Sequence, residues 1–222
     1  RMSVIIAIDG PAGSGKSSVS KEAARRLGCG YLDTGAAYRS LAWDCLDQGL
    51  ALDQSDSINA VAQSHEQLRP LNPDEQRHVV RGVDVTDAIR GEEVSSTVSA
   101  VAAHQEVRET LNEGFRRVVE SAPYPGVIVE GRDITTVVAP HSPARILLTA
   151  DEAVRIARRE AEQTGVTAEA LVRRDAADSK VVNFMTAADG VWTLDTTEMS
   201  FDEVVDAVVD YITQRTELQV AR

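Results

Sequence analysis

The stretch that decides the fold is VIIAIDGPAGSGKS, residues 4–17. Residues 4–8 form an almost unbroken apolar run, which predicts a short strand that is buried on both faces of a parallel sheet. A glycine-rich turn follows, and residues 18–27 then have a helical pattern that stops at Gly28. A strand, a glycine-rich turn and a helix in this order are the setting in which a phosphate-binding loop is found.

The turn itself matches the pattern Gly-x-x-x-x-Gly-Lys-Ser, from Gly10 to Ser17. Glycines let backbone N–H groups turn towards phosphate oxygens, because no Cβ blocks the approach, and the following helix directs its positive end at the same anion. Lys16 can reach the β- and γ-phosphates of a nucleoside triphosphate, and the Ser17 hydroxyl can bind Mg²⁺. The alternative is a glycine-rich turn that only joins a strand to a helix. The predicted binding residues for the triphosphate and Mg²⁺ are Gly10, Pro11, Ala12, Gly13, Ser14, Gly15, Lys16, Ser17 and Ser18.

Composition narrows the class of protein. The chain has 222 residues, of which 43% are hydrophobic and 26% charged, so we expect one folded domain with room for an insert. A net charge of −12 disfavours a nucleic-acid partner, because an acidic surface repels phosphate backbones. No apolar run approaches the ~18 residues of a membrane span, and Cys29 and Cys45 are expected to be buried reduced thiols. We therefore expect a cytoplasmic monomer that acts on small molecules and has no membrane partner.

Buried strands alternate with helices along the rest of the chain. Further strands are predicted at residues 31–32, 127–129, 145–149 and 191–194. Together with the first strand they predict an α/β fold with a doubly wound five-stranded parallel sheet. The segment 79–85 has a strand-like pattern around a turn at Gly82 and predicts a small antiparallel insert.

The predicted helices carry their own boundary signals. A helical period returns from residue 92 to residue 121, with a break expected near His104. Helices are also expected at 151–163 and 167–178, separated by Gly165. The last helix opens with a capping box of Ser200 and Glu203. Its predicted core stripe consists of Phe201, Val204, Val205, Val208 and Ile212.

Polar residues follow two of the predicted strands at the point where each ends. The second strand ends in Asp33, with Arg39 about one turn into the next helix, and the third ends in EGRD, residues 130–133. Ligands of such sheets bind beyond the carboxyl ends of the strands, and arginine binds phosphate with a planar fork that lysine lacks. The sequence therefore predicts an anion site at this edge of the sheet.

Each of these residues also has a simpler interpretation. An arginine can be a solvated surface charge, and Arg155, Arg158 and Arg159, which share one helix face, can pair with glutamates of their own segment. Asp133 can cap a helix, and Glu130 can merely close a strand. The four histidines have no metal-ligand spacing, so we expect no metal site from them.

Several motifs taken together resemble those of bacterial cytidylate kinases, in the same order and over nearly the whole chain. They are IDGPAGSGKS at 8–17, LDTGAAYR at 32–39, DVT at 84–86 with IR at 89–90, EGRD at 130–133, and RD at 174–175 with DS at 178–179. The resemblance implies transfer of the γ-phosphoryl group of ATP, bound with Mg²⁺, to CMP or dCMP. It also implies one P-loop kinase domain over residues 1–222, with an NMP-binding insert at 63–91 and an arginine-bearing lid at 151–165.

The resemblance further implies roles for individual residues. Arg39 and Arg132 would hold the acceptor phosphate, while Arg155 and Arg159 would cover the transferring phosphates. The implied catalytic residues are Lys16, Arg132, Arg155 and Arg159. The implied substrate-binding residues are Thr34, Arg39, Ser99, Arg108, Arg132, Asp133, Arg174 and Asp178. Among them, the residues that would read the cytosine are Thr34, Ser99, Arg108 and Asp133. The sugar would be contacted by Arg174 and Asp178.

One segment departs from the family pattern. After Asp178 and Ser179 the family usually has an arginine two residues on and a Pro-Leu pair further along, whereas this chain continues KVVNF at 180–184 and is about two residues shorter. We expect Lys180 to replace the missing arginine as a point charge, without bidentate geometry.

Two other functions share the donor half of such a site. One is a P-loop kinase for another small molecule, such as a sugar or a coenzyme precursor. The other is a nucleotide-dependent switch that binds a protein partner, although the Asn-Lys-x-Asp motif that reads guanine in GTPases is absent from the sequence. Turnover without a partner would separate a kinase from a switch.

Overall fold

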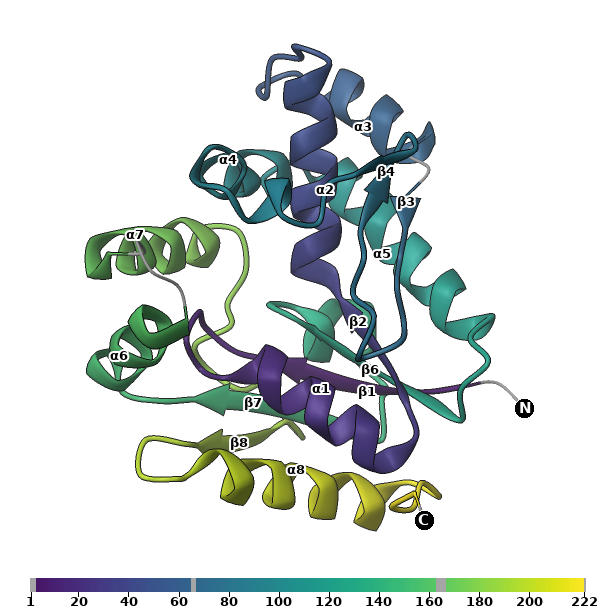
Figure 1. Ribbon diagram of the computed structural model, residues 1–222, viewed down its shortest axis with the longest axis vertical. Coiled ribbons are helices and arrows are strands. Elements are labelled where there is room, and N and C mark those ends of the chain that lie inside the picture. The colour runs from purple at the N-terminus through teal and green to yellow at the C-terminus, as the bar shows by residue number, and fades with distance from the viewer. Residues whose placement is uncertain (1–2, 65–66, 163–166, 222) are drawn as a thin grey trace.

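A five-stranded parallel sheet runs through the centre of the molecule (Figure 1). The computed structural model describes residues 3–64, 67–162 and 167–221. Its central strands are β1 (Val4–Asp9), β2 (Gly30–Asp33), β6 (Gly126–Gly131), β7 (Ala144–Thr149) and β8 (Trp192–Asp195). They lie in the order β2-β6-β1-β7-β8, and every neighbouring pair is parallel. The predicted fold class and all five predicted strands are confirmed.

Helices cover both faces of this sheet, because successive residues of a strand point to opposite sides. Ile6 and Ile8 of β1 pack in one core with residues of α1 (Lys16–Leu27) and α8 (Phe201–Arg215). Ala7, between them, belongs to the core on the other face, which is covered by α2 (Thr34–Asp47), α3 (Ser55–Ser64), α4 (Glu92–Ala102) and α5 (Gln105–Glu120). The apolar run that opens the chain is thus buried on both sides, as its sequence predicts.

A small antiparallel sheet is inserted between α3 and α4. It consists of β3 (Gln67–Leu68), β4 (Val79–Val80) and β5 (Val83–Asp84), followed by the short helix η1 (Ala88–Arg90). The two-residue turn between β4 and β5 has positive φ angles of 45° at Arg81 and 79° at Gly82, which suits the twist of a tight hairpin. The predicted hairpin is confirmed, whereas the bounds of an insert at 63–91 remain a prediction.

Helix boundaries agree with the sequence at most positions. His104 separates α4 from α5 as the N-cap of α5, and Ser200 and Glu203 form the predicted capping box. The prediction for Phe201 is wrong: this side chain is 48% exposed because it lies at the first position of α8, and Val209 joins the buried stripe instead. The helices α6 (Glu152–Glu162) and α7 (Ala168–Ser179) are present, but their predicted separator Gly165 lies outside the described residues.

Two further features complete the fold. A π-helical turn, η2 (Ile134–Val138), which the sequence did not predict, follows β6. Cys29 and Cys45 are both buried and free, and burial raises the pKa of each thiol to about 11. Within the described ranges, no helix combines the length and the apolar character that a membrane crossing requires.

Candidate active site

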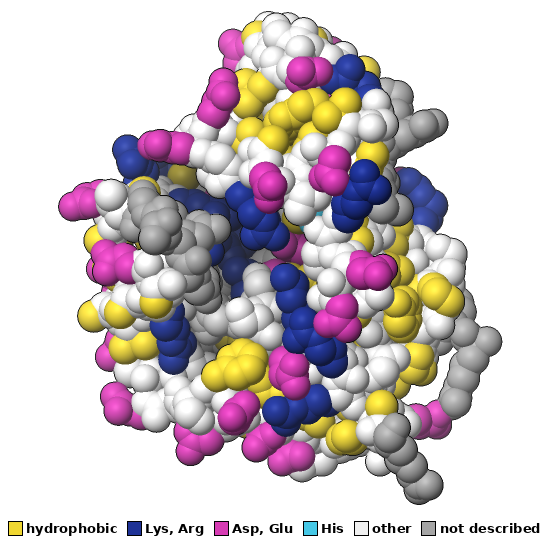
Figure 2. All heavy atoms as spheres, in the orientation of Figure 1, with side chains coloured by type: hydrophobic (Ala, Val, Ile, Leu, Met, Phe, Trp, Pro, Cys, Tyr) yellow, Lys and Arg dark blue, Asp and Glu magenta, His cyan; other side chains and the backbone are white. Residues whose placement is uncertain are grey.

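A cleft of about 340 Å³ opens where β1, β2 and β6 end. Lysine and arginine side chains gather in this hollow, although the protein as a whole carries a net charge of −12 (Figure 2). Segments far apart in the sequence line the cleft: the turn before α1, the ends of β2 and β6, η1, α4 and the α6–α7 region. The arrangement confirms that residues following separate strands meet at one edge of the sheet.

The glycine-rich turn forms one wall of the cleft. Gly13 and Gly15 have φ angles of 75° and 83°, in the left-handed region that glycine adopts without strain. A Cβ at Gly13 would also collide with the backbone carbonyl of Arg155. Lys16 then begins α1, so the unpaired N–H groups of the first turn lie at the cleft. Among the described residues, Ser14 Oγ is buried without a hydrogen-bond partner, so this turn retains a polar atom that a ligand could satisfy.

Glu130 joins the two side chains that follow this turn. Ser17 Oγ donates to Glu130 Oε1 at 2.5 Å, and Lys16 Nζ lies 3.7 Å from Glu130 Oε2. The Tyr31 hydroxyl donates to the same Oε1 at 2.8 Å, and burial together with the nearby carboxylates raises the tyrosine pKa, so it stays protonated. Burial and the nearby guanidinium of Arg132 together lower the pKa of Lys16 to about 8, although the Glu130 carboxylate opposes them. The negative charge of a bound phosphate would raise this pKa again.

The Ser17–Glu130 pair suits a magnesium ion. A hydroxyl and a carboxylate oxygen 2.5 Å apart place two hard oxygen ligands together beside the phosphate-binding turn, and Mg²⁺ takes one or two such protein ligands and completes its shell with phosphate oxygens and water. The Glu130 side chain is almost fully buried and so is held in place. The simpler interpretation, in which Glu130 merely closes a strand, does not account for its contact with Ser17.

The opposite wall of the cleft carries Arg39 and Asp33. Asp33 accepts a hydrogen bond from the Ala36 N–H at 2.8 Å and so caps α2, while Arg39 Nη2 lies 3.5 Å from its carboxylate. Among the described residues, Arg39 Nε is buried without a hydrogen-bond partner, so this guanidinium can take an additional acceptor. Thr34 lines the cleft, but its hydroxyl donates to the Glu130 carbonyl at 2.8 Å.

A second pair of opposite charges lies deeper along α5 and the end of β6. Arg108 Nη2 donates to Asp133 Oδ2 at 2.8 Å, and both residues line the cleft. The structure therefore places Asp133 opposite an arginine, and the Asp133 side chain makes no cap hydrogen bond to the turn that follows. A carboxylate beside a guanidinium offers an acceptor and donors within one small region.

Arg132, Arg174 and Asp178 line the cleft and form a network with Ser99, which is not among the lining residues. Arg132 Nη1 donates to the Gly10 carbonyl at 2.6 Å, and its Nε donates to Asp178 at 3.3 Å. The Ser99 hydroxyl donates to the other oxygen of Asp178 at 2.9 Å, and Arg174 Nε lies 3.9 Å from the same side chain. Burial and the neighbouring guanidinium of Arg132 lower the pKa of Arg174 to about 10, so a bound anion would stabilise the charged form of this side chain.

The two arginines of the predicted lid segment lie in different places. Arg159 lines the cleft, whereas Arg155 is buried behind the phosphate-binding turn. Arg155 forms an ion pair with Asp175 and donates to the Ala12 carbonyl at 2.9 Å, and Asp175 in turn accepts from the Ala12 N–H at 3.2 Å. Arg155 therefore supports the turn from outside, and its partner comes from α7 and not from the glutamates of its own segment.

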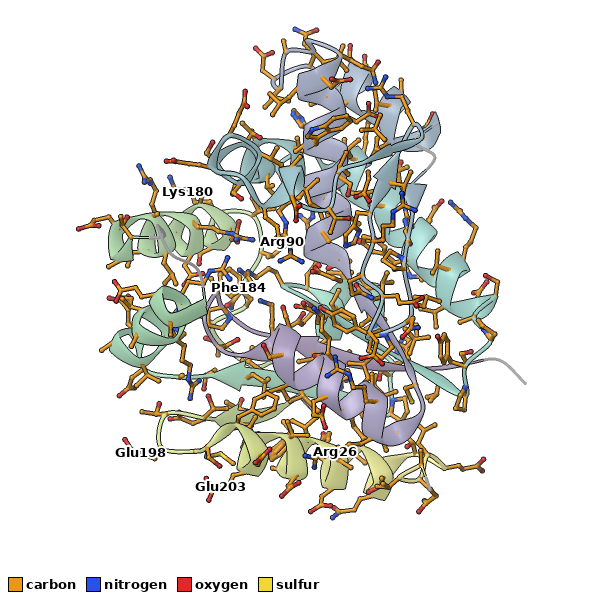
Figure 3. The ribbon with its side chains drawn as sticks, in the orientation of Figure 1. Arg26, Arg90, Lys180, Phe184, Glu198 and Glu203 are labelled. Atoms are coloured by element: carbon orange, nitrogen blue, oxygen red, sulfur yellow. The ribbon has the colours of Figure 1, made fainter. Side chains whose placement is uncertain are left out.

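Three cationic residues differ from the sequence prediction. Lys180 is exposed at the end of α7 and points away from the cleft (Figure 3), so it does not replace the missing arginine. Arg90, at the end of η1, instead lines the cleft and lies beside it in the same view. Lys21 of α1 also lines it. The sequence signal for Arg90 was its place at the end of a family motif, while nothing singled out Lys21.

Comparisons with known proteins agree with this geometry. The family model described as cytidylate kinase matches residues 6–214. A protein named cytidylate kinase from Cutibacterium acnes is 43% identical over 218 residues, covering 94% of this chain and 96% of that protein. One of the same name from Streptomyces avermitilis is 42% identical, covering 96% and 94% of the two chains, and one from Mycobacterium avium is 40% identical, covering 97% of each.

A solved structure supports the fold alone. An uncharacterized protein from Eubacterium ventriosum aligns with a TM-score of 0.52 at 14% sequence identity, covering 96% of this chain and 99% of the other. The motifs, the cleft that they build and the relatives that match over nearly the full chain lead to one conclusion. The chain belongs to the cytidylate kinase family.

Proposed function

We propose that the protein transfers the γ-phosphoryl group of ATP, bound with Mg²⁺, to CMP or dCMP, giving ADP and CDP or dCDP. The observation that carries this proposal is the cleft itself, in which a phosphate-binding turn faces a second set of guanidinium groups. One wall suits a triphosphate, and the other suits a monophosphate. Phosphoryl transfer needs the two phosphates in line and positive charge over the moving group.

The donor half consists of residues 10–18 with Glu130. Backbone N–H groups of the turn and of the first turn of α1 would bind the β- and γ-phosphates, and Lys16 would neutralise charge that develops on the transferred group. Ser17 and Glu130 would hold Mg²⁺, which supplies charge neutralisation across the phosphates when bound. Arg155 supports this half through Ala12, and Arg159 reaches the cleft from α6.

The acceptor half consists of arginines that face the turn. Arg39 and Arg132 would bind the acceptor phosphate, and Arg90 would add a third guanidinium from the insert. Arg174 and Asp178 would contact the sugar, and their link to Arg132 ties sugar binding to phosphate binding.

The Arg108–Asp133 pair would read the cytosine, with Thr34 and Ser99 at its edge. The cytosine N4 amine is a donor that suits Asp133, while its O2 and N3 atoms are acceptors that suit Arg108. Uracil has an acceptor in place of the amine and would leave the Asp133 carboxylate facing an oxygen. A site with buried polar groups rejects such an analogue strongly.

The test is a coupled assay with MgATP and each of five acceptors, which are CMP, dCMP, UMP, AMP and GMP. We expect CMP and dCMP to have the highest kcat/KM, with UMP, AMP and GMP lower by about 100-fold or more. A uniform rate with all acceptors would contradict the substrate assignment, and turnover of none would favour a different acceptor class. We propose in addition that the protein acts in the cytoplasm, on small molecules alone, and as a monomer. Gel filtration with and without CMP would test the oligomeric state.

A further inference from the structure

Phe184 lies in an uncommon environment for a phenyl ring. It belongs to the segment between α7 and β8, and its side chain is only 1% exposed. Within the described part of the chain, none of the three hydrophobic clusters includes it. The guanidinium carbon of Arg132 lies 4.8 Å from the centroid of the ring. An arginine of the cleft therefore covers part of the buried ring of Phe184.

The remaining contacts of Arg132 act on the edges of its guanidinium group. Nη1 donates to the Gly10 carbonyl and Nε donates to Asp178. Hydrogen bonds of this kind fix a planar group within its plane but leave it free to tilt. An aromatic ring against its face restricts the tilt, and a cation within about 6 Å of a ring centroid is attracted by the ring quadrupole. The Arg132 side chain is 15% exposed, so solvent screens this attraction only weakly.

We propose that Phe184 is a positioning residue that holds the guanidinium plane of Arg132 at the angle needed to receive the acceptor phosphate. The proposal rests on the proposed function, because it takes Arg132 as a phosphate ligand. Phe184 is absent from the lining of the cleft, so it acts only through Arg132. It lies beside the cleft in Figure 3. Loss of its π face is expected to impair acceptor use and to spare ATP binding.

The sharpest test varies the electrostatics of the ring while keeping its shape. Phe184 is replaced by 4-fluoro-, 3,4,5-trifluoro- and pentafluorophenylalanine, which progressively weaken and then invert the negative face. We expect kcat/KM for the acceptor to fall stepwise by about tenfold in total, with KM for ATP changed less than twofold. The thermal midpoint should stay within a few degrees, since the ring volume is nearly retained.

Substitutions with the common amino acids give an independent measurement. Phe184→Leu should lower kcat/KM for the acceptor by a similar factor, and the same change made in an Arg132→Ala background should have no further effect on it. Met185→Leu is the matched control, because Met185 is the next residue but is 50% exposed. Its kinetics should equal those of the wild type.

A spectroscopic readout separates positioning from simple packing. The Arg132 Nε–Hε resonance should be shifted by the ring current of Phe184, and the shift should disappear in Phe184→Leu. A flat fluorination series, or additive losses in the double variant, would overturn the proposal and assign Phe184 to packing. If the wild type prefers a monophosphate other than CMP, the proposed substrate fails, yet the series run with that acceptor still decides the role of Phe184.

Discussion

Arg132 touches three separately encoded parts of the chain. It binds the backbone of the phosphate-binding turn at Gly10, the carboxylate of Asp178 on α7 and the ring of Phe184 beyond α7. The sequence shows that Arg132 follows a strand end, but it shows none of these three contacts. The contacts with Asp178 and Phe184 depend on how α7 and the following segment pack against the cleft, and the departure from the family pattern at 180–184 gave no means to predict them.

Replacing Arg132 tests its place in the acceptor half. Arg132→Ala should lower kcat/KM for CMP by about 100-fold, because it removes a charge-assisted contact to the phosphate. The dissociation constant of ATP should change less than threefold. Initial-rate kinetics and titration calorimetry measure the two effects, and equal losses for both nucleotides would place Arg132 elsewhere.

Glu130 is the residue whose role the sequence left most open. Its strand-end position is compatible with a closing residue, and only the structure places its carboxylate against Ser17, Tyr31 and Lys16 together. A buried carboxylate with two hydroxyl donors is held in one orientation. Such preorganisation is what a metal ligand requires.

Neutralising this carboxylate should weaken Mg²⁺ binding. Glu130→Gln keeps the shape of the side chain, yet we expect the Mg²⁺ concentration for half-maximal rate to rise by about 10- to 100-fold. Glu120→Gln, at the exposed end of α5, is the matched control. An unchanged magnesium dependence in Glu130→Gln, measured at fixed ATP, would show that Glu130 does not bind the ion.

At the scale of elements, Asp9 fastens β1 to η2. Its carboxylate accepts hydrogen bonds from the N–H groups of Ile134 and Thr135 and from the Thr135 hydroxyl, at 2.9, 2.8 and 2.6 Å. Burial nevertheless raises the pKa of Asp9 to about 6, since desolvation outweighs these donors. The unfolded chain should titrate near the ordinary value of 3.8.

The raised pKa of Asp9 predicts how the stability of the fold changes with pH. Between pH 3.8 and about 6 the folded protein binds more protons at Asp9 than the unfolded chain does. The contribution of Asp9 to the free energy of unfolding therefore falls over this range and is lost as the pH rises through 6. Urea unfolding of the wild type and of Asp9→Asn, from pH 5 to pH 7.5, should show the wild type losing stability relative to the variant. A difference that stays constant, or grows in favour of the wild type, would mean that the hydrogen bonds dominate.

The elements themselves were largely predictable from local patterns. Apolar runs located all five strands because a parallel sheet buries both faces, and the break at His104 and the cap at Ser200 follow from local chemistry. Phe201 was misassigned because periodicity does not distinguish the first turn of a helix, which overhangs the core, from its middle. The π-helical turn η2 has no periodic signature, since it depends on the tertiary contact with Asp9.

At the scale of the whole molecule, charge is separated by location. The chain carries a net charge of −12, yet its cleft collects cations from α1, α2, η1, α5, the turn after β6, α6 and α7. Cations that face one another across the cleft repel, and bound anionic substrates offset this repulsion. Motifs at strand ends made the meeting of these residues predictable, but the inward direction of Arg90 and the outward direction of Lys180 depend on packing that no local pattern records.

Binding of both substrates should therefore draw the walls of the cleft together. We expect the radius of gyration to fall by about 1 Å when CMP and a non-hydrolysable ATP analogue with Mg²⁺ are added together, through movement of the predicted insert at 63–91 and lid at 151–165. Small-angle X-ray scattering measures this change, with GMP in place of CMP as the control. No contraction with the correct pair would show that these segments do not move as predicted.

The hydrogen bond from Arg132 to the Gly10 carbonyl has one further consequence. Because Arg132 contacts the phosphate-binding turn and also lies in the proposed acceptor half, we expect occupancy of either half to alter the free energy of filling the other. Linkage makes this influence mutual: whatever factor ATP imposes on the affinity for CMP, CMP imposes on the affinity for ATP. Each nucleotide would then change the affinity for the other through the guanidinium group of Arg132, whichever of them binds first.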